Sequence, residues 1–167
     1  DLDMRMNANS NLSARSVINE YEQQDLANIL YKYGELRNSR AIAKEIVMAR
    51  ETKEIVTTNQ LIDVVNHMVP EKKRNQFLAR IFQAIRIEVN DEINALQEML
   101  PDAVDMLNQG GRLVVLSYHS LEDRIVKNLI KKGNIEGRLE KDFFGNPIKD
   151  LKDITRKVII AQEEEIA

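Results

Sequence analysis

The sequence predicts a mainly α-helical chain with a small α/β part near its C-terminal end. Apolar residues recur every three or four positions from residue 13 to residue 100, which is the spacing of one helix face. A short aliphatic run, Leu113–Ser117, follows a pair of glycines and has the length and composition of a strand buried on both faces. After this run the helical spacing returns, at Leu121, Ile125, Val126, Leu129 and Ile130.

Five helices are expected in the first hundred residues, and the first three have recognisable ends. Ser13 can cap a short helix over Ala14–Glu20, because its hydroxyl accepts a hydrogen bond from a first-turn N–H group. Gly34 ends the second helix, since glycine suits the position just past a helix. Asn38 or Ser39 begins the third, and the sequence leaves both possibilities open.

The fourth and fifth expected helices complete an all-α subdomain. Thr57 or Thr58 caps the fourth helix, which ends near Pro70. The stretch from about Glu71 to Met99 holds neither Gly nor Pro and is expected to be one long helix. A subdomain of about ninety residues is large enough to form its own core.

The remaining chain predicts one strand–helix–strand piece of a Rossmann-like sheet. Pro101 suits the first turn of a short helix, and the strand Leu113–Ser117 and its following helix form a β–α unit. Residues 154–161 are expected to form the last strand, and Phe143-Phe144 to be an apolar plug, with base stacking as an alternative. The expected division is therefore an active-site loop or linker at 1–12, a helical insertion subdomain at 13–100, and an α/β part at 101–167.

Polar residues stand where the expected strand ends and the next helix begins, which is where ligands bind in open α/β sheets. A structural explanation covers part of this cluster: Ser120 is a good N-cap, and Asp123 stands three residues later, as in a capping box. His119 and Arg124 are left without such an explanation. From the residues alone, a functional site and a simple helix cap remain about equally supported.

The composition excludes several classes of protein. The chain has no cysteine and only two histidines, His67 and His119, so thiolate and zinc sites are not expected. No apolar run reaches membrane-spanning length, so no membrane partner is expected, and the absence of cysteine fits a cytoplasmic location. The net charge of −3 gives no global signal for nucleic acid. Any RNA would therefore bind a local basic patch.

The most basic local stretch runs from Tyr31 to Lys53. Arg40 and Lys44 lie one helical turn apart within it and share a face, so they can neutralise neighbouring phosphates. An ordinary solvated helix face explains the same charges. A second polar pattern, Gln83, Arg86 and Asn90, follows one edge of the long helix and fits either a structural ladder or RNA contact.

The segment Ser117–Lys127, with the sequence SYHSLEDRIVK, resembles the signature of the bacterial ribosomal RNA small-subunit methyltransferase H family, also called MraW. The family transfers a methyl group from S-adenosylmethionine to the exocyclic N4 amine of a cytidine in 16S rRNA. The resemblance therefore implies a class I methyltransferase fold, S-adenosylmethionine as cofactor, and 16S rRNA or the small ribosomal subunit as partner. Four further blocks resemble it in the same order: Leu2–Met6, Tyr33–Glu35, Thr57-Thr58 and Ala79–Asn90.

Within this resemblance, candidate roles can be assigned to individual residues. A cytidine amine is a poor nucleophile and needs nearby hydrogen-bond acceptors, and cations are needed to hold phosphates. The acceptor candidates are His119, Asp123 and Asp3. The candidates for RNA binding are Arg5, Arg37, Arg40, Lys44 and Arg124.

The sequence departs from the family pattern in three places. Asn7 stands where the family usually has an acid, no strand is followed by a glycine-rich loop, and the chain stops in an acidic run rather than a basic tail. We therefore expect a fragment lacking both ends, inactive by itself, whose cofactor-binding residues lie upstream and which binds S-adenosylmethionine very weakly or not at all.

Two further expectations follow for such a fragment. Residues 1–12 are expected to fray when nothing precedes them. The edge of Leu113–Ser117 is expected to pair with a second copy, giving a homodimer, or to leave the segment after Gly110 partly disordered. A function of a different class also remains open, a non-catalytic helical module that binds RNA or protein.

Overall fold

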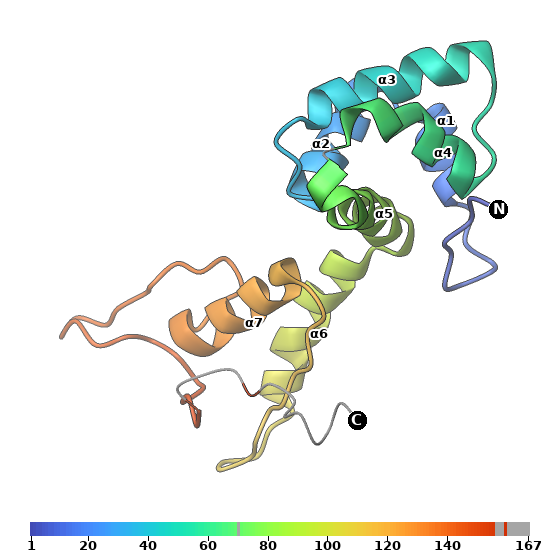
Figure 1. Ribbon diagram of the computed structural model, residues 1–167. Coiled ribbons are helices and arrows are strands. Elements are labelled where there is room, and N and C mark those ends of the chain that lie inside the picture. The colour runs from blue at the N-terminus through green and yellow to red at the C-terminus, as the bar shows by residue number, and fades with distance from the viewer. Residues whose placement is uncertain (70, 156–158, 160–167) are drawn as a thin grey trace, which may run out of the picture. The chain divides into compact units, whose positions relative to one another are not determined.

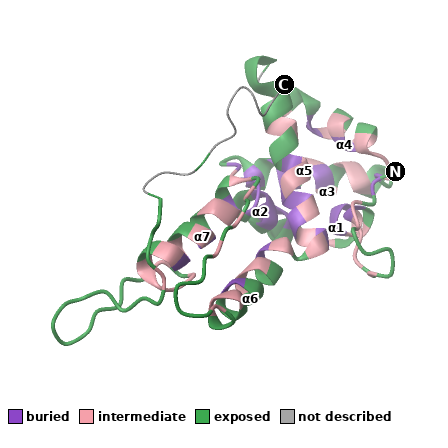
Figure 2. Ribbon diagram, turned by 90° about the horizontal axis from the view of Figure 1, so that it is seen from below, coloured by how far each residue is buried: buried purple, intermediate pink, exposed green. Residues whose placement is uncertain are grey.

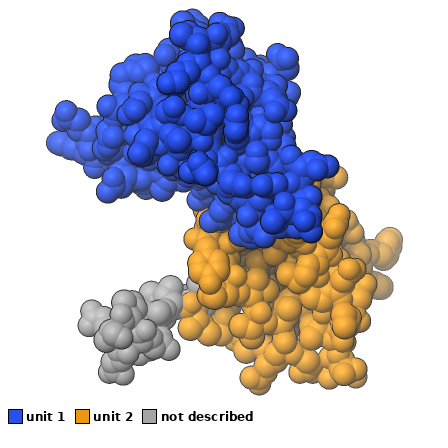
Figure 3. All heavy atoms as spheres, turned by 90° about the vertical axis from the view of Figure 1, so that its right-hand side faces the viewer, with its two compact units in different colours: residues 1–92 blue, residues 93–167 orange. Residues whose placement is uncertain are grey.

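The computed structural model describes residues 1–69, 71–155 and 159, and this part of the chain is mainly helical (Figure 1). It divides into two compact units, residues 1–92 and residues 93–167, which Figure 3 colours separately. No helix among the described residues combines the length and the apolar character needed to cross a bilayer. The α-helices are α1 (Ala14–Glu20), α2 (Gln23–Lys32), α3 (Ser39–Thr52), α4 (Thr58–Val65), α5 (Arg74–Asn90), α6 (Glu92–Asp105) and α7 (Ser120–Lys132).

The first unit is a helical domain with a continuous apolar core. Helices α2 and α3 pack against each other, α4 packs on α3, and α5 contacts α1 and α2. Figure 2 shows the buried residues (purple) lying along these helices. Each fully buried Leu or Ile contributes about 1.5–3 kcal/mol. The fully buried side chains include Ile18, Leu26, Leu30, Ile42, Ile46, Leu61, Ile81, Ile85 and Ile87.

Helix α1 begins and ends with side-chain caps. Ser13 is its N-cap, as predicted, and forms a reciprocal capping box with Ser16. At the other end, the guanidinium of Arg50 in α3 donates to the carbonyl oxygens of Ile18 (2.8 Å) and Tyr21 (2.6 Å). These bonds satisfy carbonyls that have no partner within the helix. Arg50, part of the basic stretch, therefore has a structural role.

Two further helix starts settle choices that the sequence left open. Thr57, rather than Thr58, is the N-cap of α4 and forms a capping box with Gln60. Asn38, rather than Ser39, precedes α3, and its side chain makes no cap hydrogen bond. Helix α4 ends at Val65 and is followed by a 3₁₀ turn over Asn66–Met68. The expected stop at Pro70 lies outside the described residues.

Gly34 follows α2 as predicted, but close packing rather than a left-handed conformation explains the glycine. A Cβ atom at this position would lie 2.7 Å from the Leu30 carbonyl oxygen and 2.9 Å from that of Arg80. Both are backbone atoms and cannot move aside easily. The left-handed residue of this turn is Glu35, with φ 50°. Gly34 thus lets the turn between α2 and α3 lie directly on α5.

The single long helix expected from Glu71 to Met99 is wrong. Helix α5 ends at Asn90, and Asp91 adopts a left-handed conformation with φ 51° and ψ 36°, which Asp tolerates better than most residues. Arg86 spans this break with a bidentate pair to Glu92, at 2.8 and 3.0 Å. Pro101 consequently lies inside α6 rather than in the first turn of a new helix, so that expectation is also wrong.

The second unit contains α7 as predicted, but the strand Leu113–Ser117 does not form among the described residues. A strand exists only when its N–H and C=O groups pair with another strand. The predicted partner, residues 154–161, falls largely outside the described residues. The side chains nevertheless alternate between exposed and half-buried, with Val114 and Leu116 exposed, as in an extended segment.

Phe143 and Phe144 do not form the expected apolar plug. Their side chains are 96% and 84% exposed, and the two rings meet edge to face with centroids 5.6 Å apart. Asp142 organises the turn that carries them, accepting hydrogen bonds from the backbone N–H groups of Phe144 (2.9 Å) and Asn146 (2.8 Å). The local turn therefore determines their position, and no side chain among the described residues buries them.

Candidate functional site

The start of α7 carries the most distinctive sequence motif, and His119 is its N-cap. His119 Nδ1 accepts a hydrogen bond from the Glu122 backbone N–H at 3.4 Å. In return, Glu122 Oε2 accepts from the backbone N–H groups of Tyr118 (2.7 Å) and His119 (3.3 Å). The predicted cap at Ser120 with Asp123 is therefore displaced by one residue. An extended residue must precede the helix, and His119 has that conformation, with φ −143° and ψ 164°.

This cap constrains what the His119 ring can do. The side chain is only 8% exposed, and Nε2 lies 3.4 Å from Glu122 Oε1. The geometry is not that of a hydrogen bond, so Nε2 has no hydrogen-bond partner among the described residues. A neutral imidazole that accepts at Nδ1 carries its proton on Nε2. In that tautomer Nε2 is a hydrogen-bond donor.

Asp123 and Arg124 follow His119 in the first turns of α7. Asp123 Oδ2 accepts from Lys127 Nζ at 2.5 Å, one helical turn later. The carboxylate is about one-third exposed and keeps further lone pairs with which it can accept hydrogen bonds. Arg124 is exposed and interacts with other groups. The structure thus brings His119, Asp123 and Arg124 to one helix terminus.

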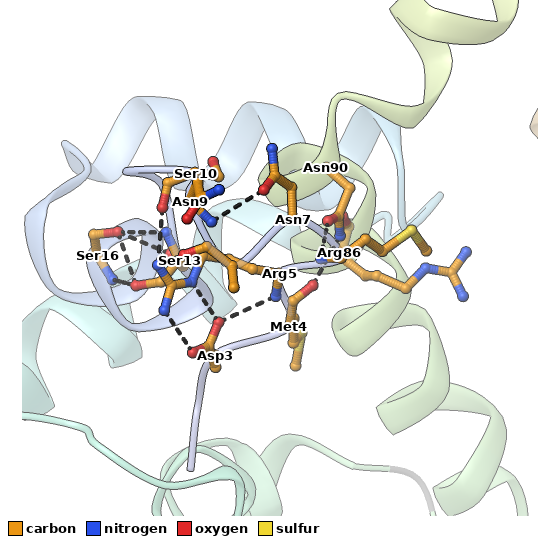
Figure 4. Close-up of polar contacts among 12 residues, drawn as sticks. Asp3, Met4, Arg5, Asn7, Asn9, Ser10, Ser13, Ser16, Arg86 and Asn90 are labelled. Carbon is orange, nitrogen blue, oxygen red and sulfur yellow. Dashed lines mark hydrogen bonds and ion pairs between the residues drawn. The ribbon is translucent and has the colours of Figure 1, made fainter.

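The N-terminal loop brings Asp3 and Arg5 together, and Figure 4 shows the loop wound around the Arg5 guanidinium. Arg5 Nε and Nη2 donate to the two carboxylate oxygens of Asp3, at 2.7 and 2.9 Å. Arg5 Nη1 donates to the carbonyl oxygens of Ala8 (3.1 Å) and Ser10 (2.8 Å). Most of the guanidinium's hydrogen-bonding capacity is therefore used to close the loop.

The expected fraying of residues 1–12 does not occur, because the helical unit holds the loop. Asn90 at the end of α5 accepts from the Met6 N–H (2.7 Å) and donates to the Met4 carbonyl oxygen (2.8 Å), as Figure 4 shows. Leu2 is 2% exposed, and its N–H donates to the Val56 carbonyl oxygen at 3.1 Å. Met4 is held at φ 61°, a conformation that costs a non-glycine residue energy and needs such support.

The ion pair also fixes the protonation state of Asp3. Hydrogen bonds from the Arg5 side chain, and then from its backbone N–H, lower the pKa of Asp3 from 3.8 to about 2. The carboxylate is therefore ionised at neutral pH. It can orient or accept a hydrogen bond from a ligand, but it does not hold a proton there.

The polar ladder on α5 is structural in all three of its members. Gln83 Nε2 donates to the Tyr33 carbonyl oxygen at 2.9 Å, Arg86 pairs with Glu92, and Asn90 holds the N-terminal loop. The ladder connects α5 to the turn after α2 and to the N-terminal loop.

Arg37, Arg40 and Lys44 lie on the surface of the helical unit. All three are exposed, and none has an ion-pair or hydrogen-bond partner among the described residues. They occupy the turn before α3 and the first two turns of that helix. The RNA-binding candidates thus differ in their bonding: the Arg5 guanidinium is hydrogen-bonded within its loop, whereas the side chains of these three surface residues have no partner among the described residues.

Comparison with known proteins assigns the chain. A model of the MraW methylase family matches residues 1–167. The chain belongs to this family. The motif Ser117–Lys127 includes the capped start of α7, the block Ala79–Asn90 lies within α5, and Leu2–Met6 opens the anchored loop.

Curated relatives agree with the family assignment. The ribosomal RNA small subunit methyltransferase H of Phocaeicola vulgatus is 52% identical over 99% of this chain and 54% of that protein. Proteins with the same name from Bacteroides thetaiotaomicron and Flavobacterium johnsoniae are each 49% identical, over 99% of this chain and 54% and 55% of those proteins. The chain spans about half the length of the curated relatives that it matches.

Sequence reasoning missed two residues that organise these regions. Glu122 closes the cap of α7, and its position three residues after His119 was the available signal. Arg50 caps α1 from α3, and no spacing in the sequence connects it to that helix. Glu122 fixes the position of the candidate His119, and Arg50 fixes the end of α1.

Proposed function

We propose that the protein methylates ribosomal RNA of the small subunit in the cytoplasm, with S-adenosylmethionine as methyl donor and the N4 amine of a cytidine in 16S rRNA as acceptor. The family match over residues 1–167, with relatives named for this RNA, carries the proposal. In this reading residues 1–12 line the active site and residues 13–100 dock the RNA. Residues 101–167 contribute the last strand–helix–strand unit of a Rossmann-like domain.

The described residues do not by themselves fit a nucleotide-type cofactor. A cradle for such a group needs a glycine-rich loop between a strand and a helix N-terminus, and no glycine of this chain occupies such a place. When bound, S-adenosylmethionine supplies an electrophilic methyl group. The contribution of this chain is therefore to hold and orient the RNA and the amine.

Asp3 in the first unit and Asp123 in the second are proposed separately, each by itself, as a hydrogen-bond acceptor for the amine. The amine lone pair is delocalised into the cytosine ring, and an acceptor that takes an N–H hydrogen bond makes the nitrogen a better nucleophile. Each carboxylate is paired with a cation, Asp3 with Arg5 and Asp123 with Lys127. Each cation also fixes its carboxylate in place, so the acceptor is already oriented before the amine arrives.

His119 is proposed to act through its Nε2 atom. Because Nδ1 accepts the bond from the Glu122 backbone N–H, the proton of the neutral ring is on Nε2, and this donor is proposed to hold a substrate oxygen. Arg124 is proposed to hold a phosphate beside it. A role as an acceptor at Nε2 would require the histidine to give up its capping bond.

Methyl transfer to purified RNA tests the proposal. The whole protein would be incubated with S-adenosylmethionine carrying a labelled methyl group and with small-subunit ribosomal RNA, which would then be digested to nucleosides. We expect the label on N4 of a cytidine, and much less of it with the Asp3→Asn variant. Label on another base, or RNA binding without any transfer, would contradict the proposal; the second result would favour a non-catalytic RNA-binding module.

A further inference from the structure

We infer that Arg37, Arg40, Lys44 and Arg80 form one docking surface for the phosphate backbone of RNA, built where the turn between α2 and α3 lies on α5. The inference rests on the proposed function, because it takes the substrate to be RNA. It adds Arg80, which stands thirty-six residues after Lys44 in the sequence, and it identifies the part of the RNA that the surface contacts. We call these four residues the basic corner.

Close packing places the α5 backbone at Arg80 against the turn that leads to α3. The Arg80 carbonyl oxygen lies 2.9 Å from the position of a Cβ atom on Gly34, so the α5 backbone at this point touches the turn that leads to Arg37. Gln83, almost one turn further along α5, donates to the Tyr33 carbonyl oxygen at 2.9 Å and fastens the turn. The basic corner therefore stands on a rigid backbone rather than on a mobile loop.

The side chains of the four cations are available to bind a ligand. Among the described residues, none of them has an ion-pair or hydrogen-bond partner, and all four are exposed. Other basic residues of the same unit are engaged: Arg15 pairs with Glu54, Arg50 caps α1, and Lys32 contacts the hydroxyl and ring of Tyr33.

Nearby acidic side chains leave the surface positive. The carboxylate of Glu45 faces His67, with Oε2 3.6 Å from the histidine Nε2. The first turn of α3, which carries Arg40, has no acidic residue. Glu35 is the acidic residue within the turn itself, and it has its own interactions.

Exposed, separated cations fit backbone phosphates better than they fit a single small anion. A free phosphate would need several donors converging on one point, whereas Arg40 and Lys44 are spaced along a helix. An RNA strand offers a row of phosphates, and each neutralised phosphate releases counterions. Such contacts position the RNA without reading its sequence. The basic corner would therefore contribute affinity and orientation but no choice of base.

Salt dependence of RNA binding tests this inference. In the whole protein, the variant Arg37→Gln/Arg40→Gln/Lys44→Gln/Arg80→Gln removes four charges at exposed sites, so its melting temperature should stay unchanged. We expect the slope of log K against log salt for small-subunit RNA to flatten by roughly 3 and the affinity to fall roughly tenfold or more.

A matched control removes the same charge elsewhere, at the exposed residues Lys53, Lys131, Lys141 and Lys152. It should retain most of the wild-type slope. The inference would be overturned if the basic-corner variant kept the wild-type salt slope, or if the control variant lost as much of that slope. Neither result would contradict the proposed methyl transfer. Failure of the proposed function would look different, because the wild-type protein would then bind RNA and transfer no methyl group.

Discussion

Two segments without regular secondary structure behave in opposite ways. Residues 1–12 look like a frayed terminus in sequence, yet their backbone is bonded to Asn90 and Val56 and closed around Arg5. Residues 111–117 look like a buried strand, yet no ladder forms on them among the described residues, and Val114 and Leu116 stay exposed. Partners within the chain, more than local composition, therefore decide whether an irregular segment is fixed.

The largest expected effect tests what fixes the N-terminal loop. Asn90→Ala removes the bonds to the Met6 N–H and the Met4 carbonyl oxygen, and it should destabilise the helical unit by about 2 kcal/mol. Hydrogen exchange at residues 3–6 and a thermal melt would measure this. The matched control is Asn28→Ala, an exposed amide on α2, which should change stability by about 0.5 kcal/mol or less. Unchanged exchange at residues 3–6 would show that Arg5 alone holds the loop.

The second prediction concerns residues 111–117, which form no ladder among the described residues. An extended apolar segment with free N–H and C=O groups recruits another strand, so this 167-residue chain should self-associate. Val114→Lys/Leu116→Lys places charges on the exposed side chains and should weaken association about tenfold, or about 1.4 kcal/mol. Sedimentation over a range of concentrations measures the change. A wild-type chain that stays monomeric at high concentration would contradict the prediction.

The comparison also explains what sequence could and could not predict. Local signals succeeded where the partner is near in sequence, as at the Ser13 and Thr57 capping boxes. They failed at Asp91, because a left-handed residue leaves no gap in the apolar pattern, and at the α7 cap, where Ser120 and His119 compete by one position. The anchoring of the loop by Asn90 joins residues more than eighty positions apart, and a single sequence contains no sign of that contact.

A third prediction distinguishes two roles of His119, which follows residues 111–117 and precedes α7: capping the helix and taking part in methyl transfer. His119→Ala should cost about 1 kcal/mol of stability, because Nδ1 caps the helix. His119→Asn restores a good N-cap but lacks the imidazole Nε2. If His119 takes part in methyl transfer, both variants of the whole protein should lose most activity, although only the first should lose stability. Recovery of activity in His119→Asn would reduce His119 to a helix cap.

The smallest expected effect appears only at acidic pH. It again distinguishes the N-terminal loop, residues 1–12, from residues 111–117. The pKa of Asp3 is lowered to about 2 in the folded loop, by the Arg5 side chain and then by its backbone N–H, from an ordinary value of 3.8. A depressed folded-state pKa means that the carboxylate stabilises the loop above about pH 4, and that this contribution is lost as the pH falls toward 2. Residues 111–117 contain no carboxylate and should show no corresponding change of their own.

Hydrogen exchange at residues 3–6, followed from pH 5 to pH 2 and corrected for the intrinsic rate, would measure this loss. Asp3→Asn is the matched control, because its amide cannot titrate and its exchange should already be fast at pH 5. Protection in the wild-type loop should approach that of Asp3→Asn near pH 2. If the protection persisted unchanged at pH 2 while the helices stayed folded, Asn90 and the Arg5 bonds to Ala8 and Ser10 would be sufficient, and the ion pair would not be what closes the loop.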